Sequence, residues 1–221
     1  MAPHWRDCEG NTMALSEMDA FEALEALKKV KRDPEQVAAW SDMIHEFVRT
    51  QDLIARVNPP VDQIRQITEH LRAINQSAEQ YEADELHRLW RVSRSDKQRG
   101  QALLPKFTQA HKDDDGVFSV HLRFGAFYLG ANRVVHGGAQ ALAFDEGLGY
   151  MIMASDQPYS RTAYIKTEFR APTPVDVDLI MRGWIEKVDG RKIYVRGELV
   201  WEDTVCTTVE GLWVALKPGH R

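Results

Sequence analysis

Residues 134–149 read VVHGGAQALAFDEGLG, and this stretch decides how the rest of the chain is interpreted. After Gly137-Gly138 the sequence is apolar on every side as far as Ser155, as in a helix that is buried all round. The exceptions are Gln140, Asp145 and Glu146. A carboxylate inside such a helix is costly unless it is paired, hydrogen-bonded or used in chemistry. The glycines offer bare backbone N–H groups at the positive end of the helix dipole. Together these are the parts that acyl transfer needs.

The composition is that of an ordinary globular protein and argues against several classes of function. The 221 residues are 43% hydrophobic, enough for one domain with a core plus an extension. The net charge of -5 gives no reason to expect nucleic-acid binding. Cys8 and Cys206 are the only cysteines, so we expect no disulfide framework, no cysteine metal site and a reducing compartment. No apolar run reaches the ~18 residues of a membrane span, and residues 1–11 lack a signal-peptide core. A cytoplasmic protein is therefore expected.

The N-terminal part of the chain has helical periodicity. Asp33-Pro34 is a good helix start, with the aspartate as N-cap and the proline in the first position. Asn58-Pro59-Pro60 ends that helix. Further helices are expected over residues 61–77 and 82–92, followed by a linker over 93–100. The chain is thus divided into a disordered segment at 1–14, a helical extension at 15–100 and a main domain at 101–221.

From Gly116 the hydrophobic period becomes two, which predicts strands. Phe118, Val120, Leu122 and Phe124 alternate with polar residues in a half-buried strand. The remaining elements are expected to be a short strand over 126–134, the apolar helix over 138–154, and strands over 161–171, 179–188, 192–201 and 205–216. The economical arrangement is an α+β fold in which a curled antiparallel sheet wraps one long central helix.

This order, with a glycine-flanked histidine just ahead of the helix, resembles the hotdog-fold acyl-CoA thioesterases. The closest resemblance is to the PaaI-like branch of phenylacetate-pathway thioesterases and their animal relatives. The shared pieces are Val135-His136-Gly137-Gly138, Asp145 nine residues past the histidine, Thr162, and the R-x-P-x-P ending at Arg170–Pro174. The resemblance covers roughly residues 110–217 and implies a hydrolase of acyl-CoA in fatty acid metabolism, with no cofactor and no metal.

The chain departs from the family pattern in three places. The family often has an asparagine or aspartate a few residues before the histidine, and here Asn132 lies closer to it than that pattern expects. Glu146 directly follows Asp145, and some branches use glutamate as the catalytic acid, although the nine-residue spacing favours Asp145. The N-terminal helices have no counterpart in minimal family members. We expect them to pack against the main domain, covering the acyl site or setting the oligomer.

Helix geometry points to a shared site. Gly138 and Asp145 are seven residues apart, on the order of 10 Å along a helix, which is too far for both to grip one carbonyl. Two antiparallel helices packed side by side would bring each N-terminus to the other chain's Asp145. The expected assembly is a two-fold homodimer, or a dimer of dimers, with two sites at the interface.

In this interpretation the thioester oxygen binds the backbone N–H of Gly137 or Gly138. Asp145 of the other chain activates water or attacks directly, and the sequence leaves both routes open. Thr162, whose role rests on the resemblance, orients the water or the carboxylate, and His136 shapes the turn rather than serving as base. Candidates for substrate contacts are Asn132, Gly138, Glu146, Arg170, Arg191 and Lys192; the last three could meet CoA phosphates or be ordinary surface charges.

Two other functions fit the same fold. A non-catalytic acyl-CoA-binding or sensing protein is the main alternative, and the interior acid Asp145 favours catalysis over it. A hydratase ranks last because its pattern of histidine and acid does not occur in the sequence.

Overall fold

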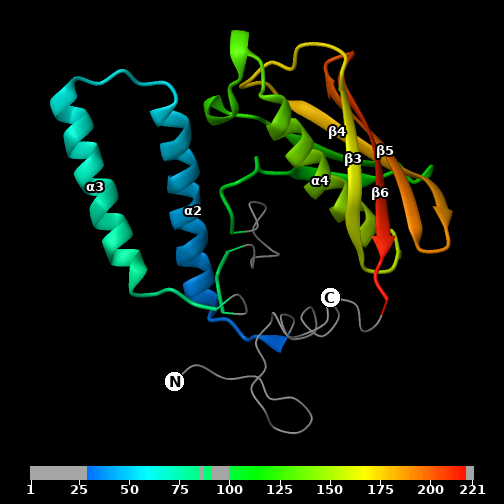
Figure 1. Cartoon of the computed structure of the whole chain (residues 1–221), viewed down its shortest axis with the longest axis horizontal. Helices are drawn as coiled ribbons and strands as arrows, with labels where there is room; N and C mark the ends of the chain where they lie inside the picture. The colour runs from blue at the N-terminus through cyan, green and yellow to red at the C-terminus, as the bar shows by residue number, and fades with distance from the viewer. Residues whose placement is uncertain (1–28, 85–86, 91–99, 218–221) are drawn as a thin grey trace, which may run out of the picture.

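The computed structural model describes residues 29–84, 87–90 and 100–217, and its centre is one antiparallel sheet. The six strands are ordered β1-β2-β4-β5-β6-β3. Their bounds are Thr108–Lys112 for β1, Phe118–Leu122 for β2, Ser160–Phe169 for β3, Leu179–Asp189 for β4, Lys192–Trp201 for β5 and Thr204–Ala215 for β6. Figure 1 shows the sheet curling around the single helix α4, Gly137–Met153, so the expected hotdog architecture is confirmed.

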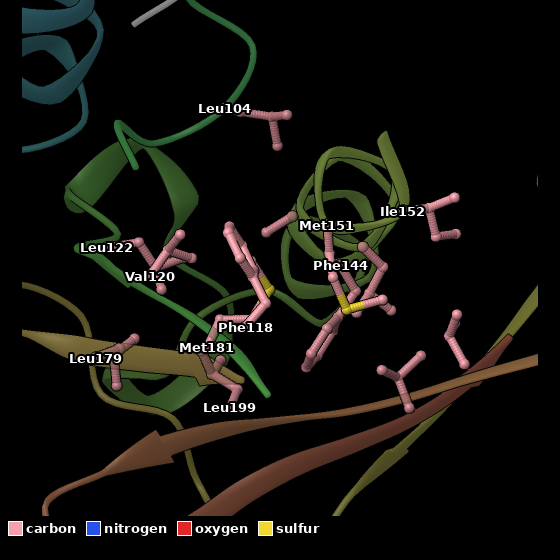
Figure 2. Packing of buried hydrophobic residues seen from close by; sticks show 14 of the residues in the cluster. Leu104, Phe118, Val120, Leu122, Phe144, Met151, Ile152, Leu179, Met181 and Leu199 are labelled. Carbon is pink, nitrogen blue, oxygen red and sulfur yellow. The ribbon is translucent and has the colours of Figure 1, made fainter. Parts of the chain in front are cut away.

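The hydrophobic core lies between α4 and the concave face of the sheet. Phe144, Leu148, Met151 and Ile152 of the helix are each 1% exposed. Figure 2 shows Phe144 and Met151 pointing toward the strands that carry Met181 and Leu199. The opposite side of α4 is less covered than predicted, because the sheet wraps only one side of the helix in a single chain: Tyr150 and Met153 are about half exposed. An apolar helix with one open side indicates that a further surface covers it.

The longer strands agree with the sequence, but two short segments do not. The strand predicted over 126–134 is wrong: the structure has two 3-10 turns, η2 at Ala126–Tyr128 and η3 at Ala131–Arg133. Asn132 and Arg133 have φ of 54° and 62°, a left-handed backbone that strands do not adopt. β1 was missed because its sequence, TQAHK, has no apolar alternation and lies exposed at the edge of the sheet.

The N-terminal helices form where the capping signals predict them. α2 runs over Pro34–Ile54, with the Asp33 side chain accepting from the Glu35 N–H, and α3 runs over Val61–Glu79. The helix predicted over 82–92 is not formed in its described residues, 82–84 and 87–90, which are turns and coil. Residues 1–14 and most of the predicted linker at 93–100 lie outside the described residues.

α2 is tied to the sheet-containing part of the chain by polar contacts at several points along its length. The Trp40 indole N–H donates to the Gly100 carbonyl at 2.9 Å, and an Asp52 carboxylate oxygen accepts from the Phe127 N–H at 3.0 Å. Just after the helix, Arg56 pairs with Asp176 at 2.7 Å. α3 lies on the outer side of α2 in Figure 1, and its apolar side chains remain 37–61% exposed. In the part of the chain that the structure describes, no helix is long and apolar enough to cross a membrane.

Candidate functional site

The first turn of α4 presents one uncommitted backbone donor. His136 is the N-cap, and its Nδ1 accepts the Gly138 N–H at 3.0 Å. Because Nδ1 accepts, the proton of the neutral imidazole is on Nε2. The Gly137 N–H has no partner among the hydrogen bonds of the described residues. Of the two glycine donors that the sequence left open, Gly137 is therefore the one available for an anion at the helix N-terminus.

Phe169, at the end of β3, lies against Gly137. A Cβ at position 137 would lie 2.7 Å from the Phe169 Cζ atom, so only glycine fits beneath the ring without a shift. The ring itself is 57% exposed. Phe169 was not among the residues predicted from the sequence. The signal that could have identified Phe169 is its position on β3, one residue before the R-x-P-x-P ending.

Asp145 and Thr162 are brought together, as the sequence analysis expected. The Thr162 hydroxyl donates to Asp145 Oδ1 at 2.7 Å, joining the middle of α4 to the start of β3. Asp145 is half-buried, and no hydrogen bond to its second oxygen occurs within the described residues. The carboxylate is thus oriented by one contact and retains an oxygen for chemistry.

A β-bulge makes this contact possible. The register of β3 against β6 shifts between Thr162 and Tyr164, which leaves Ala163 as an extra residue. Beyond the bulge, Ile165 packs against the core while Lys166 lies on the outer face and pairs with Glu210. If residues 162–166 alternated regularly, Thr162 would share the outer face with Lys166. The bulge turns Thr162 toward the helix, a known use of bulges beside functional sites.

The remaining candidates are spread over the surface. Asn132 is exposed in η3, and Glu146 is half-buried beside Asp145. Arg191 lies in the β4–β5 hairpin, next to exposed Lys192, and its guanidinium donates to the Ala215 carbonyl at 3.0 Å. Ala215 pairs with Ser160, so Arg191 lies at the same end of the sheet as Thr162.

Arg170 lies at the opposite end of β3 from Thr162. Its guanidinium pairs with Glu168 on the outer face, and Lys166 pairs with the same carboxylate at 3.3 Å. The hydrogen bond from Lys166, with the charges of Arg170 and Lys166, holds the pKa of Glu168 below its usual value. Because Arg170 is paired with Glu168, it is better interpreted as an ordinary surface charge than as a ligand for a CoA phosphate.

Two hollows on the surface of the chain lie away from the candidate site. A hollow of about 760 Å³ lies along β2 and β4, between Lys112 and Trp184, and one of about 250 Å³ lies over the charged outer face around Arg196. Neither hollow is lined by Gly137, Asp145 or Thr162. Gly137 and Asp145 are also eight residues apart on one helix, about 12 Å along its axis. The donor and the acid of one chain therefore form two separate half-sites.

Comparison with known proteins agrees with this fold. Residues 132–207, which run from Asn132 through α4 to β6, match the model of the Thioesterase superfamily. This part of the chain is therefore similar to the thioesterase superfamily. The match contains His136, Gly137, Asp145 and Thr162, the residues of both half-sites.

Two individual proteins that are similar to this chain are also described as thioesterases. Acyl-coenzyme A thioesterase THEM4 from Bos taurus is 29% identical over 110 residues, which are 48% of this chain and 45% of that protein. The chain thus spans less than half the length of this curated relative. The crystal structure of thioesterase superfamily protein RHA08564 matches with a TM-score of 0.68 at 26% identity, over 79% of this chain and 90% of that one. Since residues 100–217 are little more than half of the chain, that match extends into the region before residue 100.

The PaaI-like branch is also represented among the structural matches. The PaaI protein of the E. coli phenylacetic acid degradation operon aligns over 49% of this chain and 79% of its own, at 15% identity and a TM-score of 0.45.

Proposed function

We propose that this chain hydrolyses an acyl-CoA thioester to the free acid and CoA. The observation that carries the proposal is the hydrogen bond at 2.7 Å from Thr162 to Asp145, which holds a carboxylate ready inside an otherwise apolar helix. The Gly137 N–H, which has no hydrogen-bond partner among the described residues, supplies the second requirement, a donor for the oxyanion. The acyl-CoA substrate is further supported by the similarity to the bovine acyl-coenzyme A thioesterase THEM4.

The proposed site forms between two copies of the chain. β3 ends the sheet and leaves an unpaired edge ten residues long, a surface that proteins normally cover. Antiparallel pairing of two β3 strands centred on Lys166, with Ala163 again left as the extra residue, would set Thr162 opposite Phe169 of the partner subunit. Because Phe169 lies on Gly137, each Asp145 would then approach the other chain's donor. The open side of α4 would be buried in the same contact.

In this homodimer the thioester oxygen accepts the Gly137 N–H, which stabilises the developing oxyanion. Asp145 of the other chain takes a proton from water as the water attacks the carbonyl carbon, or attacks that carbon itself to form a mixed anhydride that water then opens. The C–S bond breaks and CoA leaves as a thiolate, so no strong general acid is needed. His136 is not the base, because its Nδ1 is occupied by the Gly138 N–H.

The proposal is tested by following thiol release from a panel of acyl-CoA thioesters, from short to long alkyl chains plus aryl acyl groups. We expect turnover of at least one class, and the profile then identifies the preferred acyl group. Binding of acyl-CoA without turnover across the panel would instead support the alternative, a sensing protein on the same fold.

The role of Thr162 can be tested separately. Hydrogen bonds to charged groups are worth roughly 1.5–3 kcal/mol, so Thr162→Val should lower kcat by about 10- to 100-fold. Thr162→Ser retains the hydroxyl and should keep most of the activity. Thr167→Val changes a threonine on the same strand, which has no contact with Asp145 among the described hydrogen bonds, and serves as the matched control. Equal activity of Thr162→Val and Thr167→Val would show that the contact orients nothing that matters to the reaction.

A further inference from the structure

Gln140 is a buried amide at a position where an apolar side chain would be expected. It lies in the first turn of α4, three residues after Gly137, and is 4% exposed. Thr173 and Thr207, on two other segments, are also buried, with 1% and 0% exposure. Burying polar groups costs free energy unless each is hydrogen-bonded, so such a cluster needs an explanation.

Every polar atom of the Gln140 amide has a partner. The Nε2 group donates to the Val135 carbonyl at 3.2 Å, while Oε1 accepts from the Thr173 hydroxyl at 3.1 Å and the Thr207 hydroxyl at 2.5 Å. The orientation of the Gln140 amide follows from its partner, because the Val135 carbonyl can only accept a hydrogen bond and must therefore face the NH₂ group of Gln140.

This network holds the peptide that leads into the candidate donor. Val135 is fixed on both sides, since its carbonyl accepts from Gln140 and its N–H donates to the Thr173 carbonyl at 2.8 Å. Thr173 therefore contributes its main chain and its side chain to the same turn. On the other side of the turn, His136 Nδ1 accepts a hydrogen bond from the Gly138 N–H. The Gly137 N–H lies between these two fixed points and is the donor left free.

We propose that Gln140, held by Thr173 and Thr207, is a positioning residue that aims the Gly137 N–H through the Val135 carbonyl. Gln140 itself touches no substrate. The inference rests on the proposed function for its kinetic consequences, although the geometry of the network stands without it. An oxyanion donor accelerates a reaction only when it is already aimed at the developing charge, and misplacement by about 1 Å can cost 10²-fold in rate. A buried amide with three hydrogen bonds provides directional control that an apolar side chain of the same size cannot.

The decisive variant is Gln140→Glu, which keeps the size and both threonine contacts. When the carboxyl group is ionised, it has no proton to donate to the Val135 carbonyl and places an oxygen against it. When the group is protonated, it can donate again and restore the network. Burial favours the neutral form of a carboxyl group. We therefore expect kcat relative to wild type to be reduced at least about tenfold at high pH and to recover as the pH falls, with KM changed less than about twofold.

Two controls separate positioning from general damage. Thr207→Val removes one hydrogen bond of the network and should lower kcat several-fold, whereas Thr208→Val, on the neighbouring outward position of β6, should not. His136 and Cys206 are the ionisable residues next in sequence to Val135 and Thr207, and both are present in wild type and in the variant.

The amide resonance of Gly137 in a ¹⁵N-labelled protein gives a readout that needs no turnover. We expect it to shift in Gln140→Glu with the same pH dependence as the kcat ratio. An unchanged resonance together with a kcat profile parallel to wild type would overturn the inference. If Gln140→Glu does not fold, equal kcat and equal Gly137 resonances in Thr207→Val and Thr208→Val would overturn it instead. If wild type turns over no thioester, the proposed function fails, and the resonance alone still decides whether Gln140 positions Gly137.

Discussion

Asp145→Asn should reduce kcat for acyl-CoA hydrolysis by about 10²- to 10⁴-fold, the usual contribution of a positioned acid or base. Asparagine has the same shape and its amide oxygen can still accept the Thr162 hydroxyl, which now lies 2.7 Å from Asp145 Oδ1. The variant therefore keeps the geometry of the site and loses only the basic, nucleophilic oxygen. Thiol release under saturating substrate measures the effect, and calorimetry with a non-hydrolysable acyl-CoA analogue should show affinity within a few-fold of wild type.

Glu146→Gln is the matched control for this experiment. Glu146 is the adjacent acid on the same helix and is half-buried like Asp145, but no hydrogen bond between it and Thr162 is found in the described structure. We expect Glu146→Gln to retain most of the activity. A large loss in Glu146→Gln with normal turnover by Asp145→Asn would move the catalytic role to the neighbouring residue.

The sequence predicted those elements whose patterns are local. The apolar stretch after Gly137 and the alternating runs of the longer strands each reflect burial of nearby residues, so α4 and the strands from β3 to β6 lie within a few residues of their expected bounds. The segment between β2 and α4 could not be predicted in this way. Its path is set by long-range contacts, such as that from Asp52 of α2 to the Phe127 N–H, and by the positive φ of Asn132.

Two features of the candidate site could not be placed from local sequence patterns, because they depend on a bulge in a strand and on polar contacts between distant residues. Thr162 appears on the helix-facing side of β3 only because Ala163 is bulged, and alternation in the sequence carries no sign of that extra residue. Gln140 was visible as a polar exception in an apolar helix. Its partners Thr173 and Thr207 are 33 and 67 residues away in the sequence. The role of this polar residue could therefore be recognised only in the folded structure.

Gly137→Pro should lower kcat by about 10²- to 10³-fold, since loss of one oxyanion donor costs ~2.7–4 kcal/mol of barrier. Proline removes the N–H and suits the first position of a helix, which Gly137 occupies in α4. His136 before it has φ of −59° and ψ of 131°, an extended conformation that a following proline accepts. Gly137→Ala is the control, because its Cβ meets the Phe169 ring in the same way while its N–H remains. Equal loss in both variants would assign the effect to the ring contact rather than to the donor.

The same variant tests whether the site is shared. If the donor and the acid come from different chains, a mixed dimer of Gly137→Pro and Asp145→Asn has one site with both groups intact and one with neither. Coexpression of two differently tagged copies, followed by purification through both tags, should therefore give about half of the wild-type kcat per dimer from two nearly inactive parents. Light scattering should give twice the 25.3 kDa of one chain for each parent and for the mixture. A site contained in one chain would leave the mixed dimer as inactive as its parents, because each copy would then carry its own defect.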